Sequence, residues 1–392
     1  MKTKYQINIF FALVLFVNLA SNLVHPITPA FFKQLELNDY MFGIAFATMS
    51  FSVFFFSPFW GKMATLISEN NVIFICCIGY ALGQLFFMSA TTEVQIILAR
   101  LWSGSFSSGI LTTTLTYIAY ISTVENKALN LTIFATVSTL GVTLGYFVGG
   151  ILGDISLQTS FIAQICMLLL SSIVFKVLLV KRSSLQPKDN ILKDANPFSS
   201  FLNIKPYLSK ILTLLLVISF VASFATTAFD QTLNYYLIDE LKFSTSYNGY
   251  VKAGVGIVSL LANVLICFRI IRNNKILQGL AIVFLICSFT LLLIIFIDTL
   301  SIFLAMAFIY FGCNSIYLPL IQNCCASYGD ENSSAIILAF YNAVKAFGMI
   351  MGALVAGFMY EISSKLPFIL ASISFFICFI GQYIYAKKHR QN

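Results

Sequence analysis

The sequence predicts an all-α integral membrane protein with 12 transmembrane helices, arranged as two halves of six. Of its 392 residues, 59% are hydrophobic and only 10% are charged, whereas a soluble domain carries nearer a quarter charged residues. Twelve apolar runs are long enough to cross a bilayer, which takes about 20 residues of helix. A pattern of glycines that ends in an acid also occurs twice, once in each half of the chain.

The apolar runs follow one another with short loops between them. The first run exceeds the apolar core of a signal peptide, and no A-x-A cleavage pattern follows it, so we expect a retained span. The expected spans, in order, are 7–32, 40–61, 72–91, 94–120, 130–152, 157–180, 211–238, 245–268, 276–297, 300–325, 333–360 and 366–386.

The basic residues predict the orientation of these spans. With both termini in the cytoplasm, most Lys and Arg fall on cytoplasmic segments, and only Lys33, Lys242 and Lys365 fall in outer loops. This asymmetry accounts for the net charge of +8 without a nucleic-acid ligand. We therefore expect a multi-pass protein in the lipid bilayer of a cell membrane. We further expect this to be a bacterial cytoplasmic membrane and the protein to be a monomer.

Two tandem halves are predicted: residues 1–180 and 210–392, joined by a polar, proline-containing cytoplasmic linker at 181–209. Such a duplication predicts a substrate site between the halves, near the bilayer midplane, and rocking between inward and outward states. The duplicated pattern pairs the following residues in order: Gly141, Gly145, Gly150 and Asp154 with Gly348, Gly352, Gly357 and Glu361.

Asp230 is predicted to be the only acidic side chain buried in an apolar span. A central charge costs about 2.5–3.5 kcal/mol on insertion scales, so such residues usually serve a proton relay, an ion or substrate site, or a buried ion pair. Arg100, Lys252 and Lys345 are the deep cations. Arg100 is either a structural cation or one that orients a proton pathway or substrate, and Lys252 either reaches the interface or stays deep. If Lys345 meets Asp230, each keeps the other charged, as a switch or as a permanent structural pair.

Uncharged polar and aromatic side chains on several spans predict an amphipathic pocket. His25 directly precedes Pro26 near the end of the first span, where prolines should bend the helix and free carbonyls toward a cavity. It is either a titrating group or a hydrogen-bonded structural histidine. The candidate substrate-binding residues are Asn22, His25, Asn234, Tyr235, Asn314, Tyr317, Tyr341 and Asn342.

Glycines spaced four apart allow two helices to approach closely, as in ordinary helix packing. Their occurrence in two copies, each followed by an acid at the same offset, favours a hinge-like role between the halves. The candidate conformational glycines are Gly61, Gly104, Gly141, Gly145, Gly149, Gly150, Gly348, Gly352 and Gly357.

With these motifs the chain resembles the major facilitator superfamily and, within it, the drug:proton antiporters, which include the staphylococcal quinolone and multidrug efflux pumps. The fifth-span glycines match that family's antiporter motif, with Tyr146 in place of its proline. Arg100 and Gly104 match the fourth-span R-x-x-x-G motif, and 51–61 resembles the end of the second span. The resemblance implies the major facilitator fold and places Asp230 where those pumps carry an embedded acid.

Three departures from the family pattern weaken this analogy. The loop after the second span lacks the family's charged motif. Asn314 stands where the pumps carry a second acid, and Lys345 lies where an uncharged residue is usual. The family's charge contacts and its cation/proton exchange are therefore only partly supported.

The favoured function is proton-coupled efflux of amphipathic small molecules by alternating access, with Asp230, Arg100 and Lys345 in proton coupling. Two alternatives stay open: the same fold exporting an anionic metabolite or a lipid-linked anion, and a transporter-like sensor or partner-binding membrane protein. No Walker loop, HExxH or nucleophile elbow is present, so we expect neither an enzyme nor a bound cofactor or metal.

Overall fold

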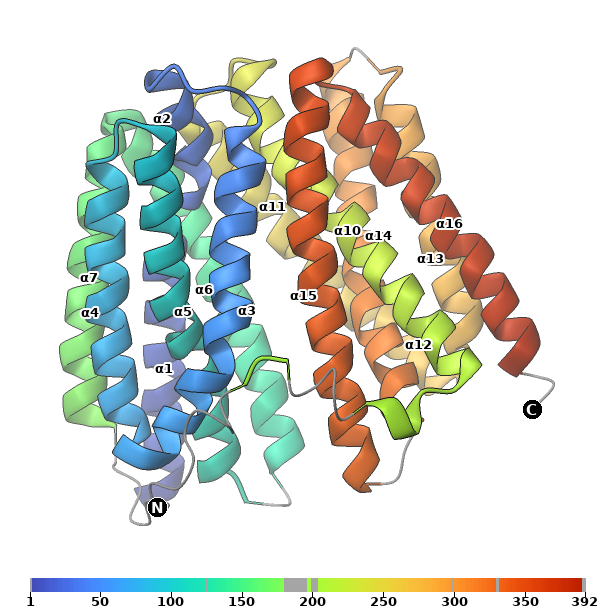
Figure 1. The fold of residues 1–392 in the computed structure, drawn as a ribbon, viewed down its shortest axis with the longest axis horizontal. Coiled ribbons are helices and arrows are strands. Elements are labelled where there is room, and N and C mark those ends of the chain that lie inside the picture. Colours follow the sequence, from blue (N-terminus) through green and yellow to red (C-terminus); the bar gives the residue numbers. More distant parts are fainter. Residues whose placement is uncertain are drawn as a thin grey trace. The chain divides into compact units, whose positions relative to one another are not determined.

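The computed structural model describes residues 2–123, 126–179, 196–198, 204–297, 299–328 and 331–389, and every regular element within them is a helix (Figure 1). Most of the predicted linker, residues 181–195 and 199–203, lies outside these ranges.

The helices begin and end near the predicted boundaries of the apolar runs. The first part of the chain contains α1 (Lys2–Asn22), the 3-10 helix η1 (His25–Ile27), α2 (Thr28–Gln34), α3 (Met41–Ile67), α4 (Glu69–Met88), α5 (Glu93–Ile121), α6 (Lys127–Ile155) and α7 (Leu157–Leu178). The second part contains η2 (Lys205–Tyr207), α10 (Lys210–Asp239), α11 (Thr245–Ala262), the π-helix η3 (Asn263–Cys267), α12 (Phe268–Arg272), α13 (Ile276–Ile294), α14 (Leu300–Ala326), α15 (Glu331–Ile362) and α16 (Leu366–His389).

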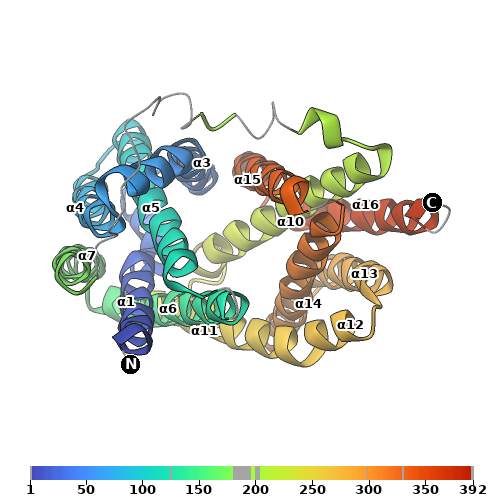
Figure 2. The same ribbon diagram turned by 90° about the horizontal axis from the view of Figure 1, so that it is seen from below.

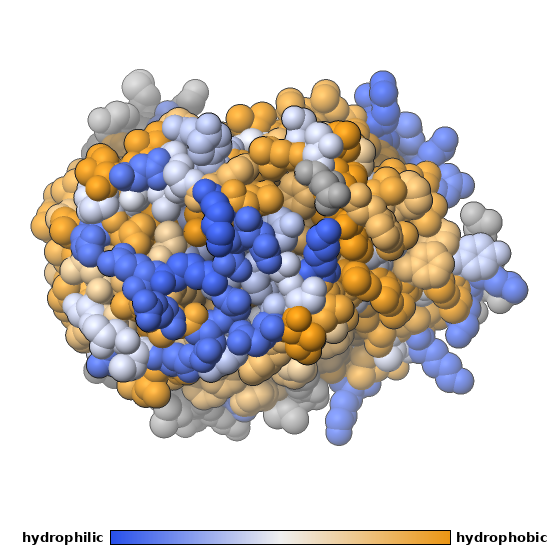
Figure 3. Space-filling view, turned by 90° about the horizontal axis from the view of Figure 1, so that it is seen from above, coloured by the Kyte–Doolittle hydropathy of each residue, from blue (hydrophilic) through white to orange (hydrophobic). Residues whose placement is uncertain are grey.

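Eleven helical segments of the described chain are long and apolar enough to cross a membrane. The prediction of membrane-spanning helices is thus confirmed, while the number 12 is not, because α5 is absent from this set. Helix α5 has 29 residues and is long enough, but it carries Arg100 and many Ser and Thr residues. Hydrophilic residues gather on the end of the molecule seen from above, and hydrophobic residues dominate the rim of that view (Figure 3).

The chain forms two compact units whose boundaries cut through helices. Unit 1 contains Met1–Leu37, Thr48–Pro197 and Leu237–Ala253, and unit 2 contains Asn38–Ala47, Phe198–Tyr236 and Gly254–Asn392. The first turns of α3 therefore belong to unit 2, and the first turns of α11 belong to unit 1. Helices α1, α4, α5, α6 and α7 lie together in unit 1, and α10, α13, α14 and α16 in unit 2 (Figure 2).

Each unit has its own core of buried side chains. In unit 1, Phe10 packs against Tyr117 with ring centroids 5.0 Å apart, within a buried cluster drawn from α1, α3, α4, α5, α6 and α7. In unit 2, Phe229 of α10 packs edge-on against Tyr310 of α14 at 4.4 Å, and Tyr310 also contacts Phe375 of α16.

The prolines interrupt the first span as predicted, because Pro26 lacks the N–H that would continue the helix. Helix α1 ends at Asn22, and α2 begins only at Thr28. The carbonyls freed at this break are taken by side chains. The Ser21 carbonyl accepts from Tyr80 (3.1 Å) and Gln164 (2.9 Å), and the Pro26 carbonyl accepts from Asn248 of α11 (2.8 Å).

Candidate functional site

Arg100 is buried in unit 1 with weak hydrogen-bond partners for its charge. It is 5% exposed, and its Cζ lies 4.0 Å from the centre of the Phe87 ring. Its Nη1 reaches the Met49 sulfur at 3.5 Å and its Nη2 the Thr28 hydroxyl at 3.3 Å. Its Nε is buried and has no hydrogen-bond acceptor among the described residues. Neither hydrogen bond of the guanidinium within the described part of the chain goes to a helix carbonyl.

The spacing of the R-x-x-x-G motif follows from one contact with α3. Residues four apart lie on the same helix face, so Arg100 and Gly104 both face Met49. A Cβ added to Gly104 would clash with the Met49 backbone carbonyl and lie 2.8 Å from the Ser52 Cβ. Glycine is required there because it lets α5 approach α3 closely enough for Arg100 to reach Met49.

His25, Tyr146 and Lys252 gather beside Arg100. The imidazole of His25 stacks on the Tyr146 ring at 5.7 Å, and the Lys252 Nζ lies 6.0 Å from the centre of that ring. Arg100 and Lys252 are the charged neighbours of His25. Lys252 is 7% exposed. Tyr146, at the family's proline position, contacts both His25 and Lys252.

A polar cavity of about 160 Å³ lies among α1, α3, α4, α5 and α6. Its polar lining comes from Asn18, Asn22, His25, Tyr80 and neighbouring Ser and Thr residues, and Met49 forms part of its wall. The Asn22 amide donates to the Asn18 carbonyl at 2.8 Å. Asn22 and His25 are thus brought to one cavity, beside the guanidinium that Met49 contacts.

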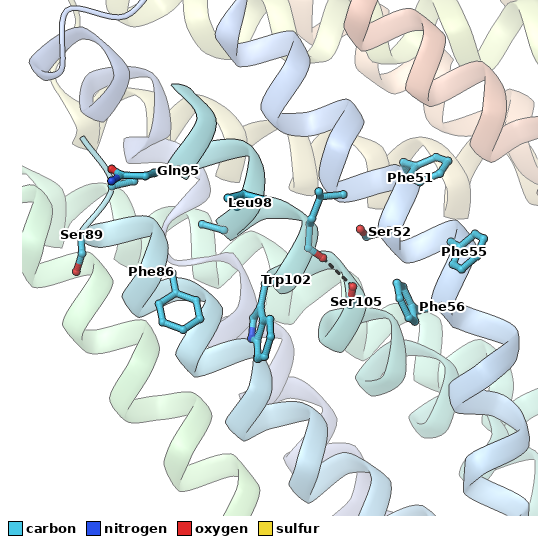
Figure 4. A pocket seen from close by; sticks show the side chains of 13 residues that line it. Phe51, Ser52, Phe55, Phe56, Phe86, Ser89, Gln95, Leu98, Trp102 and Ser105 are labelled. Atoms are coloured by element: carbon cyan, nitrogen blue, oxygen red, sulfur yellow. Dashed lines mark hydrogen bonds between the residues drawn. The ribbon is translucent and has the colours of Figure 1, made fainter. Parts of the chain in front are cut away.

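A larger pocket in unit 1, of about 890 Å³, is apolar and open to the outside of the unit (Figure 4). Its walls are aromatic and aliphatic side chains of α3, α4 and α5, such as Phe51, Phe86 and Trp102, which are 41–48% exposed. None of the site residues predicted from the sequence lines it. Its exposed apolar lining is typical of a surface that faces lipid.

Asp230 lies on α10 beside a hydrogen-bonded cluster in unit 2. Thr226, one turn earlier, bonds to Asn314 (2.9 Å) and to Tyr317 (3.2 Å), and Tyr310 donates to Asn314 at 3.3 Å. Tyr310 has Asp230 among its electrostatic neighbours, and Gln231 donates to the Asp230 carboxylate at 3.3 Å. The predicted Asn314 and Tyr317 therefore meet near Asp230. The sequence analysis did not include Thr226 or Tyr310 among the candidate site residues. Thr226 could have been found from its spacing of four residues from Asp230, which places both on one helix face.

Lys345 and Asp230 are held apart by the packing of α15 on α10. A Cβ on Gly348 would lie 2.6 Å from the Phe220 carbonyl, and one on Gly352 would clash with that of Phe224. Both contacts advance by one turn, so the helices run parallel. In this register Lys345 lies beside about residue 217 of α10. Residue 217 is 13 residues from Asp230, which is roughly 20 Å along the helix axis at a rise of about 1.5 Å per residue. The ion pair considered from the sequence is not formed in this arrangement.

The other predicted pocket residues lie elsewhere in unit 2. The Tyr235 hydroxyl donates to Asp39 at 2.6 Å, and its ring stacks on Phe42 at 4.9 Å, near the start of α3. Tyr341 is buried near Tyr317, whereas Asn342, the next residue on α15, is exposed. Asn234 is buried on α10. These four residues thus lie at different positions within unit 2.

The repeated glycines form equivalent helix contacts in the two units. In unit 1, Gly141, Gly145 and Gly149 of α6 pack against the α1 backbone from Leu15 to Leu23. In unit 2, Gly348 and Gly352 pack against α10 in the same way. Gly61 is looser, because the nearest atom to its added Cβ is a Thr112 methyl at 3.3 Å.

The last glycine and the acid of each repeat form a second pair of contacts, which we call the junctions. In unit 1, Gly150 meets Gly249, and Asp154 accepts from the Thr245 hydroxyl (2.6 Å) and the Ser246 N–H (3.1 Å) at the start of α11. In unit 2, Gly357 meets Gly43, and the Tyr40 N–H donates to Glu361 at 3.2 Å just before α3.

Each junction places a carboxylate at a helix N-terminus, where unsatisfied N–H groups and the helix dipole favour negative charge. The repeat that predicted a hinge therefore consists of matched close contacts.

The loop after α3 replaces the family's charged motif with neutral hydrogen bonds. The Ser68 hydroxyl bonds to Asn70 at 2.5 Å, Asn71 donates to the Ile67 carbonyl at 2.5 Å, and Lys176 of α7 donates to Asn71. Polar residues thus join α4 to α7 at this end of unit 1.

Together, an all-helical fold with many membrane-spanning segments, two helix-packing repeats and polar groups deep in the spans define a membrane transport protein. The family model of the Major Facilitator Superfamily matches residues 10–353, and the chain belongs to that superfamily.

Full-length relatives are distant. The Quinolone resistance protein NorA of Staphylococcus aureus (strain COL) is 22% identical over 98% of this chain and 97% of its own. Multidrug resistance protein 2 of Bacillus subtilis (strain 168) is 19% identical, covering 93% of this chain and 90% of its own.

Solved structures share the fold. The nucleoside transporter NupG aligns with a TM-score of 0.73 at 16% identity, covering 99% of this chain and 100% of its own. The human organic anion transporter MFSD10 (TETRAN) aligns with a TM-score of 0.69 at 15% identity, covering 97% of this chain and 100% of its own.

Proposed function

We propose that this transporter exports amphipathic small molecules across a cell membrane in exchange for protons, by alternating access, with Asp230 as the residue that binds the coupling proton. The observation that carries the proposal is the setting of Asp230, a carboxyl group on a membrane-spanning helix beside a cluster of neutral hydrogen-bonding groups.

The physical argument concerns the cost of burying charge. An ionised Asp at the centre of a span costs about 2.5–3.5 kcal/mol on insertion scales, and a protonated one costs much less. Gain or loss of one proton therefore changes the energy of α10 at the position where it packs against α14. A change of that size is enough to shift a balance between two conformations.

The relatives support the choice of cargo. Full-length similarity reaches proteins named for quinolone and multidrug resistance, which is consistent with a broad range of amphipathic substrates. The polar cavity of unit 1 and the cluster around Thr226 supply hydrogen-bonding groups for such cargo.

The test is uphill flux in proteoliposomes driven by a pH gradient, with a hydrophobic cation and a hydrophobic anion offered separately. Asp230→Asn keeps the shape of the side chain but cannot exchange a proton, so we expect gradient-driven flux to fall to the level of empty vesicles. Glu36→Gln, which neutralises an exposed carboxylate after α2, is the matched control and should keep full flux.

Undiminished uphill flux in Asp230→Asn, with normal insertion, contradicts the assignment of Asp230. Absence of any solute flux in the wild-type protein favours the sensor or partner-binding alternative instead.

A further inference from the structure

Unit 1 contains a group of deep basic residues that the proton-coupling proposal does not use. Arg100, Lys252 and His25 come from α5, α11 and η1; His25 and Lys252 flank the Tyr146 ring, and His25 also lines the small polar cavity. Arg100 lies eight residues beyond its helix cap Thr92, and Lys252 seven beyond Thr245, which is about 10–12 Å along each helix.

No carboxylate of the described residues of unit 1 lies at this depth. Its acids, Glu36, Glu69, Glu93, Asp154, Asp239 and Glu240, all stand in loops or within two residues of a helix end. Asp154 is engaged at the junction with Thr245 and Ser246. Arg100 is 5% exposed, and its contacts are a thioether, a hydroxyl and an aromatic ring, so it is a buried cation that an anion can neutralise.

Arg100 has unused hydrogen-bonding capacity. A guanidinium carries five N–H donors in a planar fork that matches an oxyanion. Here two of its nitrogens make long contacts, to a thioether and to a hydroxyl, and Nε has no acceptor among the described residues. Buried donors rarely lack an acceptor, so this one points to a ligand that completes it.

The path from Arg100 to the cavity runs through Met49. Its sulfur contacts the guanidinium, and the same side chain lines the cavity. Methionine has three rotatable bonds and adapts easily, so a small rotation would expose the fork to a ligand. The cavity, about 160 Å³, fits a charged head group but not a drug-sized molecule.

From these observations we infer that Arg100, Lys252 and His25 form a binding site for the oxyanion group of an amphipathic organic anion. Tyr146 positions His25 and Lys252, and the apolar lining of the cavity, which includes Val53, Ile110 and Phe134, receives the carbon skeleton next to the head group. The inference depends on the proposed transport only in treating this anion as cargo. The proposed proton site, Asp230, lies in the other unit.

The experiment is equilibrium binding to the purified full-length protein without a pH gradient. Three probes of matched shape are compared by calorimetry: naphthoate, naphthalenemethanol and naphthylmethylammonium. We expect naphthoate to bind about tenfold or more tighter than the alcohol, and the ammonium probe not to bind measurably. A hydrogen bond to a charged group contributes about 1.5–3 kcal/mol, and a difference of about 1.4 kcal/mol changes the dissociation constant tenfold.

Arg100→Gln and Lys252→Gln should each weaken naphthoate at least about tenfold and leave the alcohol unchanged. Lys176→Gln removes a lysine of the same unit, bonded to Asn71, and should change neither affinity. If Arg100→Gln fails to fold, Met49→Cys provides a second measurement. Naphthoate, but not the alcohol, should then slow its reaction with a maleimide.

Equal affinities of the wild type for naphthoate and the alcohol would overturn the inference, as would unchanged naphthoate affinity in both glutamine variants. Because the binding measurement applies no gradient, a wild-type protein that binds naphthoate but shows no proton-driven flux contradicts the export proposal alone.

Discussion

At the residue scale, Arg100, Lys252 and Asp230 stand out because charge is costly in an apolar span. Which of them meet depends on how each helix is rotated and on the register between helices, and neither is encoded in spacing along one chain. The grouping of His25, Tyr146 and Lys252 is such a case, because its three members come from different helical elements.

The distance between Lys345 and Asp230 gives a prediction at this scale. Residues in contact show interaction energies of about 0.5–3 kcal/mol in double-mutant cycles, whereas residues more than about 10 Å apart are additive within about 0.5 kcal/mol. Because the α10–α15 register separates them by roughly 20 Å, we expect Asp230→Asn and Lys345→Gln to add. Thermal unfolding of the purified single and double variants measures this.

A coupling energy above about 1 kcal/mol would contradict that prediction and reinstate the ion pair as a switch. Thr226→Val combined with Asn314→Ala is the positive control, because these side chains are hydrogen-bonded at 2.9 Å and should couple.

At the element scale, the sequence repeat was more informative than any single residue. Gly150 with Asp154 and Gly357 with Glu361 were recognisable as equivalent because internal duplication repeats contacts as well as residues. Their partners, Gly249 and Gly43, end two further segments that are similar between the halves, 243–249 (FSTSYNG) and 37–43 (LNDYMFG). The contact of each carboxylate with a helix N-terminus could not be predicted from the sequence, because it depends on the start of one helix packing against the end of another.

Gly150→Ala tests the junction in unit 1. The added Cβ would lie 2.6 Å from the Thr245 carbonyl and 3.0 Å from the Gly249 Cα, so a backbone must move. Overpacking costs about 1–3 kcal/mol, and the gain in helix propensity over glycine is about 1 kcal/mol. We expect a net loss of up to about 2 kcal/mol in the free energy of unfolding, and a similar loss for Gly357→Ala.

Gly61→Ala is the comparison, because its Cβ would meet only a Thr112 methyl at 3.3 Å, which can move. It should be neutral or stabilising. If Gly150→Ala proves as stable as Gly61→Ala, the close approach of α6 and α11 is not maintained in the membrane.

At the scale of the whole molecule, the element that departs from the prediction is α5. Composition predicts it as the fourth span, yet its hydropathy separates it from the other long helices. Several of its hydroxyl groups do not oppose burial, because they donate to carbonyls of their own helix: Ser105 to Leu101 (2.8 Å), Thr114 to Ile110 (2.7 Å) and Thr116 to Thr112 (2.8 Å). Hydropathy scales assign each of these groups a cost that the helix removes. At 29 residues α5 is about 43 Å long, more than the hydrocarbon core of about 30 Å.

We therefore expect α5 to cross the membrane, which places its two flanking loops on opposite sides. Thr91 precedes α5, Asn126 follows it, and both are exposed. A membrane-impermeant maleimide should label Thr91→Cys in intact cells but Asn126→Cys only after permeabilisation, in a background where the exposed Cys166 is serine. Labelling of both sites from the same side would mean that α5 does not cross. The membrane would then hold 11 spans with termini on opposite faces, and the deep position assigned to Arg100 would be wrong.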